Sequence, residues 1–275
     1  MAGFFAMEPG IGPGRWLVEA APWLTVGPPA TAFMFGGVGL GASVEAAERT
    51  TGRSVVWATA QYLTYAPRGA TVEFEVTPLV EGRQTSQVRL TAWVDGRQML
   101  GAGLSLGEKP GAVRRQFVAP GIVPPPQDCP PMPLRWGSAP DDLYSRLETR
   151  VAKGWDATGD DVGHMVFWMR PTGKPGMGGG PIDRPMLAIM ADFVPASIGN
   201  ALSDGQGDVA ANSLDNCIRF LNIVDTEWVL CDIRVHGAAS GFGHGEMLLF
   251  AQDGTLMATA SQSVILRSLR YQQAG

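Results

Sequence analysis

The sequence predicts an α+β fold made of two copies of one unit, a helix followed by an antiparallel meander of strands. Three observations indicate this. Strands follow one another in both halves of the chain, several with alternating apolar and polar residues, and each half contains an Asp-Gly turn between two of them. Each half also has one glycine-rich or apolar helix ahead of its main strands. A stretch crowded with proline separates the two halves.

The first half is predicted to place one helix before a four-stranded meander. A short strand at 16–20 precedes a glycine-rich stretch that leads into a helix over 35–52. Asp95-Gly96 is typical of a type I′ hairpin turn. Gly37, Gly39 and Ala42 match a degenerate dinucleotide-binding fingerprint, but that motif requires a βαβ unit, so nucleotide binding is not expected. The predicted strands are 54–63, 71–76, 86–94 and 99–106.

The second half repeats this pattern after a linker. Prolines between Gly107 and Pro140 exclude the interior of a sheet or helix and predict an extended segment. When Asp253-Gly254 is aligned with Asp95-Gly96, the flanking strands align without gaps, which suggests a duplicated domain. The expected domains are 1–106 and 141–275, joined by a linker at 107–140. The second-half strands are predicted at 164–169, 212–220, 227–235, 246–251 and 257–267.

Composition excludes several classes of protein. A formal net charge of −5 with 17% charged residues argues against a nucleic-acid binder. The sequence has no block of basic residues that would indicate binding to a membrane surface. No apolar run approaches the roughly 18 residues needed to span a bilayer. The first fifteen residues lack the pattern of a signal peptide. Three scattered cysteines match neither a disulfide framework nor a zinc site. We expect a soluble, cytoplasmic protein without metal or cofactor.

One carboxylate interrupts the apolar helix of the second half. Met186 to Ala191 is apolar throughout and predicts a buried helix, and Asp192 follows it directly. Pro195 lacks the N–H that would bond the carbonyl of Ala191, so the helix is expected to kink beside Asp192. From this stretch alone, Asp192 is either the N-cap of a second short helix or a functional carboxylate.

Several short motifs follow one another along both halves of the chain. The first half contains Phe35-Gly36-Gly37, Tyr62-Leu63-Thr64-Tyr65-Ala66-Pro67, Glu81-Gly82-Arg83 and Val94-Asp95-Gly96-Arg97. The second half contains Ala191-Asp192-Phe193, Ser213-Leu214-Asp215 with Phe220, and Gln252-Asp253-Gly254 followed by Ala260-Ser261-Gln262. Their order and spacing resemble those of the type II acyl-CoA thioesterases with a double hot-dog fold, over most of the chain outside the linker. This resemblance implies two antiparallel sheets, each wrapped around a central helix.

The resemblance also implies an active site. By matched position, Asp192, Ser213 and Gln262 would hold the hydrolytic water. A carboxylate can accept the proton of a water that attacks a thioester, and a hydroxyl and a carboxamide can orient it. Backbone N–H groups at a glycine-rich helix start are candidates to bind the thioester oxygen. They belong to either of two glycine pairs, Gly36 and Gly37 or Gly179 and Gly180.

The repeat serves as an internal control for this site. In the ungapped alignment Gln262 falls opposite Leu104, and the first-half helix has no carboxylate buried after an apolar run. Glu45 and Glu48 are expected on a solvated face of that helix. The polar residues are therefore concentrated in the second half, as expected for one working site.

Other candidates carry less weight. His164, His236 and His244 lack metal-ligand spacing, and no G-x-S-x-G motif predicts a serine hydrolase. Asp215 is either catalytic or a structural partner of the backbone at the strand edge. The aromatic residues that recur along the first-half strands are interpreted as core: Trp57, Tyr62, Phe74 and Trp93.

The family pattern also has departures. Val38 stands where many members have a glutamine. Asn216, Leu221 and Asn222 stand where members often have histidine, histidine and arginine, which would help to hold a phosphorylated carrier such as CoA. An acyl-binding protein without turnover is therefore the alternative, and a hydratase-type enzyme, which would need an Asp/His pair, is a weaker third hypothesis. The prediction is hydrolysis of acyl thioesters, acyl-CoA above all, to free fatty acid and CoA. Exposed sheet edges suggest a homo-oligomer.

Overall fold

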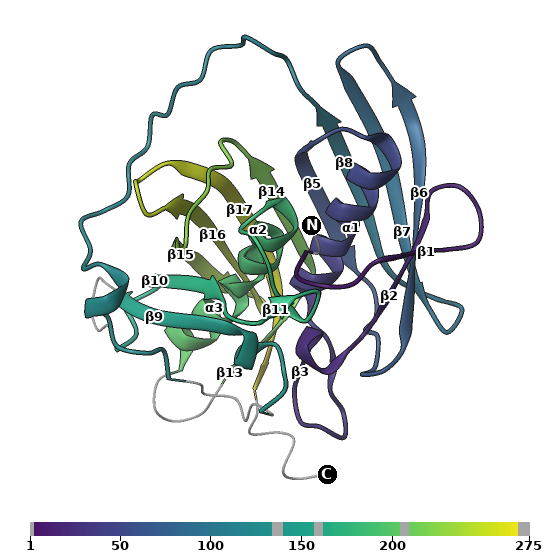
Figure 1. Ribbon diagram of the computed structural model, residues 1–275. Helices are drawn as coiled ribbons and strands as arrows, with labels where there is room; N and C mark the ends of the chain where they lie inside the picture. The colour runs from purple at the N-terminus through teal and green to yellow at the C-terminus, as the bar shows by residue number, and fades with distance from the viewer. Residues whose placement is uncertain (1–2, 134–139, 157–161, 204–208, 269–275) are drawn as a thin grey trace.

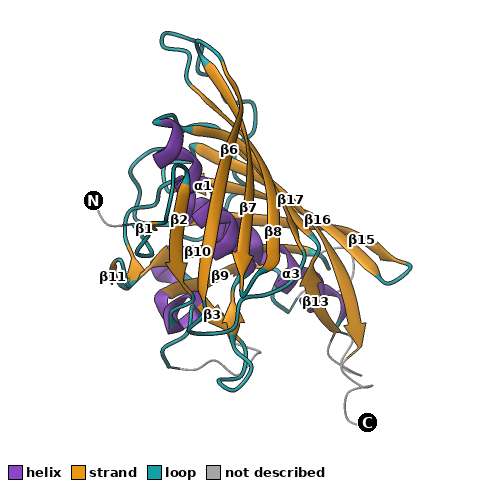
Figure 2. Cartoon of the chain, turned by 90° about the vertical axis from the view of Figure 1, so that its right-hand side faces the viewer, coloured by secondary structure: helices purple, strands orange, loops and turns teal. Residues whose placement is uncertain are grey.

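One continuous antiparallel sheet dominates the structure. The computed structural model describes residues 3–133, 140–156, 162–203 and 209–268. Within these residues thirteen strands form a sheet in the order β1-β2-β6-β7-β8-β5-β14-β17-β16-β15-β10-β9, with β13 also paired to β17 (Figure 1). The helices lie on one side of the strands β6, β7 and β8 (Figure 2). The α+β prediction is confirmed.

The two halves have matching sets of elements. The first half contains β1 (Glu8–Pro9), β2 (Arg15–Glu19), α1 (Gly36–Thr51), β5 (Val55–Tyr62), β6 (Thr71–Glu81), β7 (Thr85–Val94) and β8 (Arg97–Gly107). The second contains β9 (Leu147–Lys153), β10 (His164–Pro171), α2 (Arg184–Met190), α3 (Val194–Leu202), β13 (Val209–Ser213), β14 (Asp215–Phe220), β15 (Val229–Ala239), β16 (Phe242–Ala251) and β17 (Leu256–Ser268). Two small sheets pair β3 (Thr25–Val26) with β4 (Phe33–Met34) and β11 (Lys174–Pro175) with β12 (Gly178–Gly179).

The predicted strands are close to the observed ones. Strands β6 and β15 are separated by the same sequence interval as Asp95 and Asp253, as the ungapped alignment requires. Asp95 (φ 48°) and Gly96 (φ 73°) both have left-handed backbone conformations, which confirms the type I′ turn. The prediction of a single strand over 212–220 is wrong: Leu214 separates β13 from β14. The short strand β9 was not predicted.

The two expected sheets are joined into one. Strand β5 of the first half pairs with β14 of the second, with Ala58 opposite Ile218 and Thr59 opposite Cys217. Each of these strands would otherwise leave its outward N–H and C=O groups without partners, and their pairing satisfies both edges. Helix α1 packs against β5 to β8, whereas α3 packs against β13 and β15 to β17.

Glycines allow α1 and α2 to approach closely. A Cβ atom at Gly37 would lie 2.6 Å from the carbonyl oxygen of Ile189, and one at Gly41 would lie 2.7 Å from that of Pro185. These two glycines are one helical turn apart and therefore present one face to α2. The glycine-rich stretch of the first half thus has a packing role.

This packing predicts that Gly41→Ala destabilises the protein. The added methyl group would meet backbone that cannot rotate away, and overpacking of this kind costs about 1–3 kcal/mol, more than the helix propensity gained. Urea denaturation measures the loss. Gly39→Ala is the matched control, because its Cβ would meet the flexible end of Leu100 at 2.9 Å and should cost less. Equal stability of the two variants would contradict the close helix contact.

The expectation that Glu45 and Glu48 lie on a solvated face is wrong. The Glu45 side chain is 13% exposed and that of Glu48 is 26% exposed, and α1 is in contact with both the sheet and α2. Burial is the largest cause that raises the pKa of each. Glu45 is paired with Arg49, and Glu48 accepts a hydrogen bond from the Val55 N–H at 2.8 Å.

The proline-rich linker runs around the outside of the second half (Figure 1). In its described part the only helix is the short 3₁₀ turn Pro126–Asp128, as the extended prediction implies. Gln116 donates to the Gly254 carbonyl at 2.9 Å, and Trp168 Nε1 donates to the Pro124 carbonyl at 3.0 Å. The linker is thereby held against the second half. Residues 134–139 of the predicted linker lie outside the described residues.

One helical run would suit a membrane by composition alone. Arg184–Leu202 is long and apolar enough to span a bilayer, but 72% of its most apolar window is buried within the protein. This burial is typical of a core helix.

Candidate active site

Asp192 lies where the central helix of the second half is broken. Helix α2 ends at Met190, a single 3₁₀ turn (η5, Ala191–Phe193) follows, and α3 begins at Val194. Asp192 has φ −87° and ψ 22°, outside helical values, and Pro195 occupies the first turn of α3. The predicted break beside the carboxylate is therefore present.

The alternative in which Asp192 caps the second helix is wrong. Phe193 is the N-cap of α3, and no side chain caps that helix. The aspartate that does cap a helix here is Asp183, which accepts from the Met186 N–H at 3.0 Å. The carboxylate of Asp192 is instead directed to other elements.

Three predicted site residues converge on one another. Ser213 Oγ donates to Asp192 Oδ1 at 3.1 Å. Gln262 Nε2 donates to the same carboxylate oxygen and to Ser213 Oγ, the latter at 2.8 Å. The N–H of Gly37 donates to Asp192 Oδ2 at 2.6 Å. The carboxylate thus receives hydrogen bonds from α1, β13 and β17, so both halves of the chain build its surroundings.

The pKa of Asp192 reflects this buried position. The residue is 3% exposed, and burial raises its pKa from 3.8 to about 6. Hydrogen bonds from Gln262, Ser213 and Gly37 act in the opposite direction. The carboxylate is therefore ionised at neutral pH, with a basicity suited to accepting a proton.

A cavity of about 1380 Å³ opens beside Asp192. Gly36, Asp192 and Ser213 contribute to its wall. Much of the remaining wall is apolar, and Phe193 packs edge-on or tilted against three aromatic rings at centroid distances of 5.6–6.2 Å: Phe35, Tyr144 and Phe167. Such a space suits an acyl chain.

Only one of the two predicted glycine pairs lies beside the Asp192 carboxylate. Gly36 and Gly37 lie against Asp192, since Cβ atoms there would approach Asp192 Oδ2 and Cβ at 2.7 and 2.8 Å. Gly179 instead packs against Gly173, and Gly180 against the segment at Gly3. Neither of this second pair contributes to the cavity wall.

Two residues near the carboxylate were missed as site residues. Tyr62, interpreted as core, contributes to the cavity wall. Asn216 is fully buried and lowers the pKa of both Asp192 and Tyr62, so it lies beside both. Their positions in the sheet could have identified them. Asn216 of β14 lies opposite Ala60 of β5, and Tyr62 follows Ala60 by two residues and so shares its face of the sheet.

The remaining polar candidates have structural partners. Asp215 Oδ1 accepts from the Ser263 N–H at 2.7 Å, which supports its structural interpretation. His164 Nε2 lies 2.8 Å from Asp232, and His244 Nδ1 lies 3.1 Å from Ser263 Oγ. Among the described residues no three His, Cys, Asp or Glu side chains are grouped to hold a metal ion.

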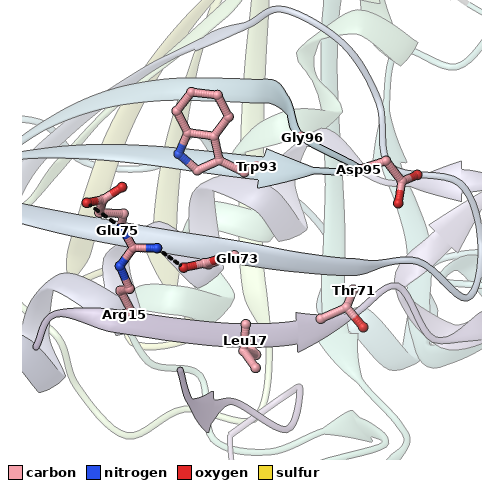
Figure 3. Close-up of a pocket in the computed structure, with 8 residues that line it drawn as sticks. All are labelled: Arg15, Leu17, Thr71, Glu73, Glu75, Trp93, Asp95 and Gly96. Atoms are coloured by element: carbon pink, nitrogen blue, oxygen red, sulfur yellow. Dashed lines mark hydrogen bonds and ion pairs between the residues drawn. The ribbon is translucent and has the colours of Figure 1, made fainter. Parts of the chain in front are cut away.

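A second hollow lies on the exposed face of β2, β6 and β7 (Figure 3). Its volume is about 460 Å³. Arg15 lies between Glu73 and Glu75 and is paired with both carboxylates, so its charge is already balanced. This hollow contains none of the predicted site residues.

Family models match most of the chain. Residues 24–107 match the acyl-CoA thioesterase N-terminal domain, and residues 126–266 match the acyl-CoA thioesterase C-terminal domain. No curated protein sequence gives a significant match.

Solved structures agree in fold. A protein assigned as a thioesterase from Novosphingobium aromaticivorans is 33% identical, with a TM-score of 0.84 over 95% of this chain and 98% of its own. A hot-dog protein from Alicyclobacillus acidocaldarius is 22% identical, with a TM-score of 0.77 over 95% and 96% of the two chains. An acyl-CoA thioesterase II from Mycobacterium marinum is 19% identical, with a TM-score of 0.74 over 96% of each chain. The fold is the hot-dog fold.

Proposed function

The chain belongs to the acyl-CoA thioesterase family, and we propose that it hydrolyses acyl thioesters, with acyl-CoA as the substrate. One observation carries the proposal. A buried carboxylate with a pKa of about 6, Asp192, borders a large cavity and is held by Ser213 and Gln262. A base of this strength beside a space for an acyl chain suits water-mediated hydrolysis of a thioester.

In the proposed reaction Asp192 takes a proton from water as the water oxygen attacks the thioester carbonyl carbon. Ser213 and Gln262 fix the orientation of the carboxylate. Gln262 Oε1 is buried without a hydrogen-bond partner among the described residues, so it can accept the second O–H of the water. The C–S bond then breaks, Asp192 returns the proton to sulfur, and an acid and a thiol leave.

The developing negative charge on the carbonyl oxygen requires a donor. The N–H of Gly37 is already used by Asp192. Gly36 is the first residue of α1, so its N–H has no acceptor within the helix, and it borders the cavity. We assign the Gly36 N–H to the oxygen.

The carrier is proposed to be CoA. Arg267 contributes to the cavity wall and offers a positive charge to the carrier phosphates. We further propose that residues 1–106 and 141–275 form two domains joined by the linker, a division supported by the separate matches to N- and C-terminal family models.

Release of free thiol tests the function. The purified protein is incubated with straight-chain acyl-CoAs of increasing length and with the matching acyl N-acetylcysteamine thioesters, and thiol is followed with a colorimetric reagent. We expect release from acyl-CoA, and a lower KM for acyl-CoA than for the thioesters without phosphates. Binding of acyl-CoA without thiol release would favour the acyl-binding alternative. No release from any thioester would contradict the proposal.

A further inference from the structure

A buried tyrosine whose hydroxyl proton has no acceptor belongs to the wall of the proposed substrate cavity. Tyr62 is the last residue of β5, and its backbone N–H donates to the Leu214 carbonyl at 3.0 Å, between Ser213 and Asp215. The side chain contributes to the cavity wall. Its Oη atom is buried, Asn216 lies beside it and lowers its pKa as a donor to the oxygen would, and no described residue accepts the hydroxyl proton. A buried hydroxyl proton without an acceptor destabilises a fold, and the oxygen of a bound ligand would supply the missing acceptor.

The tyrosine and the carboxylate flank the same point. The position that a Cβ atom of Gly36 would occupy lies 2.7 Å from Asp192 Oδ2. It lies 3.3 Å from Tyr62 Cζ, the ring carbon that bears the hydroxyl. Tyr62, the N-terminus of α1 and the proposed base therefore meet at one place in the cavity wall. A thioester carbonyl that reaches Asp192 also comes close to Tyr62.

The other donors around the carboxylate are already engaged. The Gly37 N–H, the Ser213 hydroxyl and the Gln262 amide all donate to Asp192. Asn216 does not contribute to the cavity wall. The Gly36 N–H and the Tyr62 hydroxyl do not donate to Asp192, and both lie at the one point beside the carboxylate where a carbonyl oxygen would sit.

The hydroxyl keeps its proton over the working range of pH. Burial, followed by the Asp192 and Asp215 carboxylates, raises the pKa of Tyr62 well above 10. The phenol is thus a neutral hydrogen-bond donor and cannot compete with Asp192 as the base.

We propose that Tyr62 is a catalytic residue whose hydroxyl, together with the Gly36 N–H, donates a hydrogen bond to the thioester carbonyl oxygen as the tetrahedral adduct forms. The proposal rests on the proposed function. The proton stays on the tyrosine throughout, and no covalent bond to Tyr62 forms. The hydrogen bond strengthens as charge grows on the oxygen, so it stabilises the transition state more than the bound substrate.

The test is Tyr62→Phe, which removes only the hydroxyl. Its kinetics are measured with the acyl-CoA that the wild type hydrolyses fastest. We expect kcat to fall about 10²-fold with KM little changed, as for the loss of one oxyanion donor. Because no residue accepts the hydroxyl proton in the fold, the melting temperature should stay close to that of the wild type. The midpoint of the acid limb of the pH profile should not move, since Asp192 keeps its hydrogen bonds.

Thr71→Val is the matched control, because it also removes one hydroxyl, at an exposed residue of the hollow on the other face of the sheet and outside this cavity. It should keep kcat within about twofold, as expected for a surface substitution. Wild-type kcat in Tyr62→Phe would overturn the proposal. A fall in kcat accompanied by a lower melting temperature would instead indicate a structural role, and a shifted acid limb would indicate a role through Asp192; either overturns it. If the wild type releases no thiol, the hydrolase proposal fails and the role of Tyr62 fails with it.

Discussion

Asp192→Asn is expected to lower kcat/KM for thioester hydrolysis by about 10²–10⁴-fold, the range that a general base contributes. The amide cannot accept a proton from water at neutral pH. Substrate binding should change much less, because the cavity wall is otherwise intact. Initial rates of thiol release at several substrate concentrations separate kcat from KM.

The matched control for this variant is Glu73→Gln. It makes the same carboxylate-to-amide change in the hollow on the exposed face of the sheet (Figure 3), where Glu73 pairs with Arg15. It should retain wild-type rates. Circular dichroism spectra and melting temperatures establish that both variants are folded. Equal rates for Asp192→Asn and the wild type would refute Asp192 as the base.

The strands could be predicted because their signals are local. Alternation of apolar and polar residues marks a strand from its own sequence, and Asp95-Gly96 marks a type I′ turn because both residues tolerate positive φ. The repeat then extends the prediction from one half to the other, as the bounds of β6 and β15 confirm.

The junction between the halves could not be predicted in this way. Strand β5 pairs with β14, but the pattern that identifies each as a strand is the same whether its outer edge is free or paired. The position of Glu45 and Glu48 depends on the same long-range arrangement. A helix covered on one side is solvated on the other, whereas α1 is covered by both the sheet and α2.

The candidate site was only partly predictable for a related reason. Asp192, Ser213 and Gln262 could be chosen because the order of motifs resembles a family, and their side chains do meet. Nothing local distinguishes Tyr62 from an ordinary core aromatic, because alternation gives only the face of the strand. A glycine pair ahead of a helix likewise looks the same at Gly36 and at Gly179, although only the first lies beside the carboxylate.

The activity should depend steeply on pH. Hydrolysis requires ionised Asp192, whose pKa is about 6, so kcat/KM should fall about tenfold for each pH unit below that value. An ordinary aspartate would place this limb near pH 4. Rates measured from pH 4.5 to 8 with one acyl-CoA locate the midpoint. A rate that is independent of pH down to 4.5 would contradict a raised pKa at the base.

The raised pKa of Asp192 also predicts that the free energy of unfolding falls as the pH rises, whereas the activity increases. The folded protein keeps the Asp192 proton between about pH 4 and 6, where the unfolded chain has released it. This contribution is fully present below pH about 4 and is lost as the pH rises through about 6, with a total of about 3 kcal/mol. Burial raises the pKa of Glu45, Glu48 and Asp183 as well, so the wild-type curve alone is a sum of several groups.

Comparison with Asp192→Asn isolates the one group, because the other carboxyls are common to both proteins and the amide does not titrate. Urea denaturation at pH 4 and pH 7 gives the unfolding free energy of each. The wild type should lose about 2 kcal/mol more than the variant over this interval, because at pH 4 the unfolded chain is already partly deprotonated. A difference that stays constant with pH would mean that Asp192 titrates near 3.8 in the fold, and burial could then no longer account for its strength as a base.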